Sequence, residues 1–264
     1  MIGTYTRYRY TIDHLKDTRD RLLQEPVVSR ETTYYIENIK KVRTIDEFLS
    51  DDRLYDYAMK AYGLGEMIYA KGLMRKLLTD PEMADKMSDK RYAEFVKAFN
   101  FHALGEKATQ SVAAVKGAVN KYIQQTLEEE MGKSDPGVRL ALYFTRIVGG
   151  MQQGGGISKK GWAYQILGDK ALTQVVFTAL GIPNSIRKSD VDVQKRLLET
   201  HLSFEDVATP EGVERLISRF SAMYDKDNNQ PASAALALLK NSAPNTLGGF
   251  SLDSLEALQA LRRH

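Results

Sequence analysis

Residues 49–64 read LSDDRLYDYAMKAYGL, and residues 167–182 read LGDKALTQVVFTALGI. Laid over each other at a constant offset of 118 positions, the two stretches share five identical residues. The identities pair Leu49, Asp51, Leu54, Ala61 and Gly63 with Leu167, Asp169, Leu172, Ala179 and Gly181. Such a match between two distant parts of one chain indicates an internal repeat.

Each stretch also has the pattern of one amphipathic helix. Apolar residues recur at positions i, i+3, i+4, i+7 and i+8, starting from Leu54 in one stretch and Leu172 in the other. The preceding Asp51 or Asp169 can accept hydrogen bonds from the first free N–H groups. The glycine that follows each helix suits a left-handed C-terminal cap.

Two more helices follow each of these stretches in the same order. The second is expected around Met74 in the first copy and around Leu197 in the second. The third is expected to begin at Ser88 and at Thr209, two good capping residues. The order predicts a duplicated three-helix unit.

The sequence therefore predicts an all-α, multihelical fold. Two pseudo-repeated three-helix units, at residues 49–100 and 167–221, are joined by a long helix pair. The first helix of that pair is expected from about Ala108 to Met131, with Gly117 weakening it without ending it. The second begins after the capping residue Asp135 and runs to about Val148.

A glycine-rich segment, residues 149–161, is the expected linker between two helical lobes. The lobes are an N-terminal one at residues 1–150 and a C-terminal one at residues 151–264. Within the second lobe, residues 225–231 read as a turn. Short helices are expected beyond it, at residues 232–239 and 251–261.

The N-terminal region contains three further predictions. In the stretch from Thr4 to Tyr10, Tyr8 and Tyr10 alternate with Arg7 and Arg9, which is typical of an extended arm packed on the body. A helical pattern covers residues 28–41. Thr44 and Glu47 fit a capping box at the start of the next helix.

Composition excludes several classes of protein. The 264 residues include no cysteine, which rules out disulfides, thiolate nucleophiles and cysteine-bound metals. With 37 basic and 34 acidic residues, the formal charge of +3 does not indicate nucleic-acid binding. We expect no membrane span and no cleaved signal peptide, because no long apolar run occurs.

No catalytic, cofactor-binding or metal-binding residue is predicted. The glycine run before Lys159 lacks the strand and the register of a phosphate-binding loop. Asp225 and its neighbours lack the glycine and glutamate of a calcium loop. Four scattered histidines offer no metal-binding pair, and residues 128–130, three glutamates near a helix end, are expected on a solvated face.

The sequence resembles a domain-of-unknown-function family of alphaproteobacteria whose genes often lie beside flagellar basal-body rod and motor genes. The resemblance covers roughly residues 5–225. The stretches that carry it are ETTYYI at 31–36, DEFL at 46–49, YAMKAYGL at 57–64, MIYAK at 67–71, DKRY at 89–92, AFNF at 98–101, QTLEE at 125–129, GVRLALYF at 137–144, ALGIP at 179–183 and DVQ at 192–194.

The resemblance implies a non-enzymatic flagellar accessory, structural or assembly protein that acts through helical surfaces. Its partners would be flagellar rod, hook or export components, with no cofactor and no nucleic acid. The expected location is the cytoplasm, or outside the cell after export by the flagellar apparatus. Two alternatives are a cell-wall hydrolase for flagellar assembly and a helical sensor that holds a small molecule between the repeats.

Overall fold

The computed structural model describes residues 3–87, 89–150, 159 and 161–228. Every regular element in these residues is a helix, as the sequence predicts, and none of them is long and apolar enough to cross a membrane. The chain divides into two compact units, Met1–Asp225 and Lys226–His264. Both predicted lobes therefore contribute to the first unit, and a lobe boundary at the glycine-rich segment stays a prediction.

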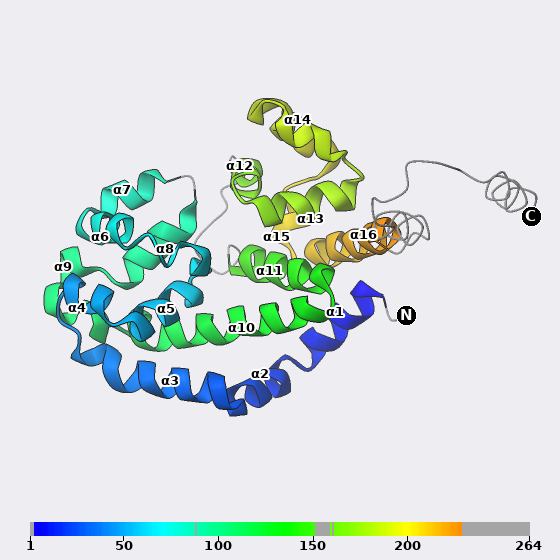
Figure 1. The fold of residues 1–264 in the computed structure, drawn as a ribbon. Coiled ribbons are helices and arrows are strands. Elements are labelled where there is room, and N and C mark those ends of the chain that lie inside the picture. The colour runs from blue at the N-terminus through cyan, green and yellow to red at the C-terminus, as the bar shows by residue number, and fades with distance from the viewer. Residues whose placement is uncertain (1–2, 88, 151–158, 160, 229–264) are drawn as a thin grey trace, which may run out of the picture. The chain divides into compact units, whose positions relative to one another are not determined.

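Among the described residues, the first half of the chain forms nine α-helices (Figure 1). They are α1 Thr4–Asp13, α2 Leu15–Gln24, α3 Pro26–Asn38, α4 Ile45–Ser50, α5 Asp52–Ala61, α6 Lys71–Thr79, α7 Pro81–Lys86, α8 Lys90–Ala98 and α9 Phe101–Leu104. Short turns of tighter or wider helix connect them: η1 Ile39–Lys41, η2 Gly65–Met67, η3 Gly105–Gln110 and η4 Ala113–Gly117.

The second half begins with the two long helices of the predicted pair. The elements are α10 Ala118–Ser134, α11 Pro136–Gly150, α12 Trp162–Leu167, α13 Lys170–Leu180, η6 Asn184–Lys188, α14 Val191–His201, α15 Glu205–Ala208 and α16 Pro210–Asn228. Asp135 caps α11 as expected, because its Oδ1 accepts hydrogen bonds from the backbone N–H of Gly137 at 2.9 Å and of Val138 at 3.3 Å.

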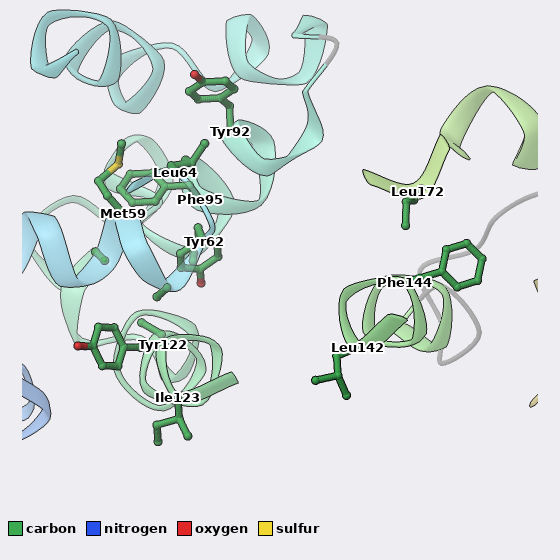
Figure 2. Packing of buried hydrophobic residues seen from close by; sticks show 14 of the residues in the cluster. Met59, Tyr62, Leu64, Tyr92, Phe95, Tyr122, Ile123, Leu142, Phe144 and Leu172 are labelled. Atoms are coloured by element: carbon green, nitrogen blue, oxygen red, sulfur yellow. The ribbon is translucent and has the colours of Figure 1, made fainter. Parts of the chain in front are cut away.

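The pair α10 and α11 lies in the middle of the helices of the first unit. α5 packs on α10, α13 packs on α11, and the two long helices pack on each other. Figure 2 shows Tyr122 and Ile123 on α10, and Leu142 and Phe144 on α11, within one cluster of buried apolar side chains. The ring of Tyr122 stacks on that of Tyr57 from α5, with centroids 3.8 Å apart. Burial of these side chains is the main source of stability.

α5 and α13 begin and end in the same way. Oδ1 of Asp51 accepts a hydrogen bond from Leu54, and Oδ1 of Asp169 accepts one from Leu172, both at 3.0 Å. Gly63 and Gly181 have φ of +69° and +67°, the left-handed region that glycine adopts without strain. The next residue in each copy closes the helix with a 2.8 Å hydrogen bond to the carbonyl five residues earlier. The predicted helix start and stop are confirmed.

The elements around α5 and α13 also follow the same order. The order α4, α5, η2, α6, α7, α8 is matched by α12, α13, η6, α14, α15, α16. α4 packs against α5 and α6, and α12 packs against α13 and α14. These matches support the duplication, which stays a prediction until the two sets of helices are superposed. Thr209 caps α16 as expected, whereas Ser88 lies outside the described residues and Asp89 caps α8.

The prediction of an extended N-terminal arm is wrong in conformation. Residues 4–13 form the helix α1, and it packs on α11. The buried residues Thr4, Tyr8 and Thr11 are spaced for one helical face, whereas Tyr10 is 61% exposed. The apparent two-residue period came from side chains that do not share a face.

The first long helix also differs from the prediction. Residues 105–110 form the separate turn η3, and Ser111 Oγ accepts the N–H of Ala114 at 3.0 Å where the helix restarts. Ala113–Gly117 then forms a single wide π turn before α10. Thr109, in η3, is fully buried. Its hydroxyl donates a 2.6 Å hydrogen bond to the backbone carbonyl of Val42. The segment around Ala108 is therefore bound to an earlier part of the chain, and the long helix begins after Ser111.

The turn predicted at residues 225–231 is wrong for residues 225–228, because α16 continues to Asn228, and residues 229–231 lie outside the described residues. The carboxylate of Asp225 accepts hydrogen bonds from the backbone N–H of Thr4 at 3.0 Å and from its hydroxyl at 2.6 Å. The expected helices at 232–239 and 251–261 lie outside the described residues, as does most of the glycine-rich segment.

Candidate functional site

Glu128 is the charged residue that the sequence placed wrongly. Its side chain was expected on a solvated face, but it is 1% exposed, on the side of α10 that α11 covers. Charge pattern alone favours solvent exposure, and it cannot show that a second helix packs over this position. A buried carboxylate needs a partner, so its surroundings are the first candidate for a functional site.

Arg146, on α11, is that partner. Its Nε donates to Oε1 of Glu128 at 2.6 Å and its Nη2 donates to Oε2 at 3.0 Å. Nε2 of Gln124 donates to the same Oε1 at 3.2 Å. Burial by itself would lower the pKa of the Arg146 guanidinium, but the hydrogen bond and charge of Glu128 outweigh it and raise that pKa. Glu128 and Arg146 therefore form a bidentate ion pair.

The network continues from α11 to α13. The guanidinium of Arg146 lies 5.0 Å from the ring centre of Tyr143, whose hydroxyl donates to Oδ2 of Asp169 at 2.5 Å. Asp169 is the residue that caps α13, so one carboxylate serves both contacts. Burial, followed by the negative charge of Asp169, raises the pKa of Tyr143.

A similar arrangement occurs at the start of α5. The hydroxyl of Tyr34 donates to Oδ2 of Asp51 at 2.8 Å, and the guanidinium of Arg53 lies 3.7 Å from the Tyr34 ring centre. Each capping aspartate thus accepts backbone N–H groups through one oxygen and a tyrosine hydroxyl through the other. This pairing of cap and tyrosine ties α5 to α3 and α13 to α11.

Arg91 makes a third tie, at the other end of α5. It donates from Nε to both oxygens of Asp89, at 3.0 and 3.1 Å, and from Nη1 to the carbonyl of Gly63 at 2.5 Å. The hydrogen bond to Asp89 raises the pKa of Arg91. The aspartate that caps α8 therefore also orients the arginine that holds the C-terminal turn of α5.

Comparison with known proteins identifies the family. Residues 61–213 match the model of the family described as protein of unknown function (DUF1217). The chain belongs to this family. The residues of the network between α8 and α13 lie inside the matched segment. A comparison with functionally curated proteins gave no match.

A solved structure of a related protein supports the assignment. The chain is similar to protein AGR_C_984 from Agrobacterium tumefaciens, known from its crystal structure, with 39% sequence identity and a TM-score of 0.74. The similarity covers 86% of this chain and 97% of the Agrobacterium protein. The expected membership in a family of unknown function is confirmed, and the flagellar setting stays a prediction.

The described part of the DUF1217 chain includes two surface hollows, and the first is lined in part by Asp51 and Arg53 of the network. One, of about 700 Å³, is lined by residues around the start of α5, among them Asn38, Lys41, Glu47 and Asp52. The other, of about 470 Å³, lies along α7 and α8 and is lined by residues such as Asp85, Lys90 and Glu94. Neither lies between the two predicted repeats, so a ligand held there stays a prediction.

In the described part of the chain, no group of three histidine or acidic side chains could hold a metal ion. The rings of His14 and His201 each contact the backbone carbonyl four residues earlier on their own helix. The network's carboxylates accept hydrogen bonds from arginine, glutamine, tyrosine and backbone N–H groups. The hydrogen bonds of the network therefore connect neighbouring helices to each other.

Proposed function

We propose that this protein is a non-enzymatic accessory or assembly protein of the flagellum that binds protein partners through its helical surfaces. The observation that supports a binding role over catalysis is that the carboxylates of the buried network already have hydrogen-bond partners within the protein. Glu128 is held by Arg146, and Asp169 is held by Tyr143 and the first turn of α13. A general acid or base needs a carboxyl group that can reach a substrate proton.

Support for the flagellar role comes from the family resemblance and its genetic setting. A helical body whose internal charges hold it rigid can present a fixed surface to a partner, which lowers the entropy cost of association. Partners among rod, hook or export components, and a location in the cytoplasm or beyond the export apparatus, belong to the same proposal.

Deletion of the gene in its host tests the proposal. We expect fewer assembled filaments by electron microscopy and smaller swimming zones in soft agar, both restored by the wild-type gene on a plasmid. A deletion strain with normal filaments and normal swimming would contradict the flagellar role.

The non-enzymatic part has its own test. The purified chain is incubated with isolated peptidoglycan, and soluble fragments are measured by chromatography against lysozyme as a positive control. We expect no release above a heat-denatured sample. Release that disappears when a single exposed carboxylate is changed, such as Glu66→Gln, would support the hydrolase alternative instead.

A further inference from the structure

Arg187 is the charged side chain in the described part of the chain whose buried nitrogen atoms lack a hydrogen-bond partner. Both its Nε and its Nη2 are buried without an acceptor. The residue lies in the turn η6 between α13 and α14, and its guanidinium carbon is 5.9 Å from the ring centre of Phe177. A buried charged donor without an acceptor is costly, so its retention needs an explanation.

The two atoms without a partner, Nε and Nη2, form one edge of the planar guanidinium group. Nε–H and Nη2–H point the same way and together match the two oxygens of a carboxylate. Arg146 uses this edge on Glu128, and Arg91 uses it on Asp89. A carboxylate therefore fills this edge at Arg146 and at Arg91, whereas the same edge of Arg187 is empty.

The acidic residues nearest in sequence do not fill it. Oδ1 of Asp190 accepts the backbone N–H of Asp192 at 2.8 Å, as the cap of α14. Oδ1 of Asp192 accepts the hydroxyl of Tyr164 at 2.7 Å. Burial lowers the pKa of Arg187, and no nearby carboxylate counteracts it, in contrast to Arg146.

The surroundings are those of a surface that a partner can cover. Arg187 as a whole is half-buried, so rotation of its long side chain brings the edge to the surface. Lys188 beside it is exposed, and Val191 and Val193 on the first turn of α14 are 50% and 44% exposed. Cationic and apolar groups together complement a segment with both acidic and apolar side chains.

We propose that Arg187 is an anchor for a carboxylate of a protein partner, bound through its Nε and Nη2 on the surface formed by η6 and the start of α14. The inference rests on the proposed role as a protein-binding protein, and it names the chemistry of the partner. Arginines that form such bidentate ion pairs with a partner are common among the residues that contribute most to interface affinity.

The full chain, labelled with ¹⁵N, provides the direct test. The Nε–H signal of Arg187 is assigned by its loss in Arg187→Lys and followed during titration with a hexaglutamate peptide. We expect this signal to shift and saturate, while that of Arg146 stays in place and a hexaglutamine peptide has no effect. No shift with hexaglutamate would overturn the proposal, as would a shift at lower concentrations of inorganic phosphate than of peptide.

Fluorescence anisotropy of labelled hexaglutamate gives the affinity. We expect Arg187→Lys and Arg187→Gln to weaken binding about tenfold, since lysine keeps the charge but loses the fork. Arg196→Gln, an exposed arginine of α14, removes the same charge and should change the affinity less than twofold. Equal losses in Arg187→Gln and Arg196→Gln would reduce the effect to general charge and overturn the assignment.

The two proposals can fail separately. If the deletion strain swims normally but hexaglutamate binds at Arg187, the anchor stands and the partner lies outside the flagellum. If deletion abolishes filaments and hexaglutamate does not bind, the flagellar role stands without this anchor.

Discussion

Glu128 of α10 and Arg146 of α11 form a bidentate ion pair, with N–O distances of 2.6 and 3.0 Å, across the interface of the two longest central helices. The carboxylate is 1% exposed and the arginine side chain 27% exposed. The pair lies between the helix that supports α5 and the helix that supports α13. The pair therefore crosses the contact between these two central helices.

Removing one partner of this pair should be strongly destabilising. We expect Glu128→Leu or Arg146→Met to lower the free energy of unfolding by about 3 kcal/mol, because the remaining charge is left buried without compensation. Urea denaturation measures the change. The double variant Glu128→Leu/Arg146→Met should recover most of the loss, and a simple sum of the two single losses would show that the residues act independently.

The two glycine caps should respond alike to substitution. Gly63→Ala and Gly181→Ala each place a side chain at positive φ, which costs about 1 kcal/mol. A Cβ at either site meets its nearest atom at 3.6 or 3.8 Å, so the cost is backbone strain and not a clash. Thermal unfolding measures it.

The matched control is Gly72→Ala, in a helix with open space around the added Cβ. It should keep stability unchanged or raise it by up to about 1 kcal/mol. A loss at Gly63 but none at Gly181 would argue against equivalent helix ends in the two predicted repeats.

Asp225 should control the order of α1. Its carboxylate accepts the N–H and hydroxyl of Thr4, so Asp225→Ala removes a cap worth about 1 kcal/mol. Hydrogen exchange followed by mass spectrometry should show faster exchange in residues 4–13 and little change in α5. Asp227→Ala, an exposed aspartate on the same helix, is the control, and equal acceleration in both variants would contradict the assignment.

Asp89 should make stability depend on acid pH. Burial of its carboxyl group favours the neutral form, but the hydrogen bonds and charge of Arg91 outweigh burial and lower the pKa. Because the pKa of Asp89 is lower in the folded than in the unfolded chain, its ionised carboxylate stabilises the protein at pH values above the unfolded pKa. This stabilisation is lost as the pH falls below about 4.

Asp89→Asn should therefore be less stable than wild type at pH 6, and this difference should shrink as the pH falls to 3. Urea midpoints at the two pH values measure the difference. A constant difference across this range would show that the Asp89 charge does not contribute.

Helix identity and helix ends could be read from the sequence because they depend on neighbours within a few residues. The stripe from Leu54, the carboxylate of Asp51 and the glycine at 63 are local signals, and each has the predicted structure. The capping box at Thr44 and the cap at Asp135 follow the same rule. An all-helical fold followed from the sum of such signals.

What the sequence could not determine depends on contacts between distant residues. The Thr4–Tyr10 segment is helical because Asp225 caps it and its 4, 8, 11 face meets α11. Glu128 is buried because Arg146, on another helix, compensates its charge. The free edge of Arg187 became visible only once its neighbours were placed. Sequence fixes local periodicity, whereas burial and charge pairing are decided by packing, because the free energy of a charge depends on every group around it.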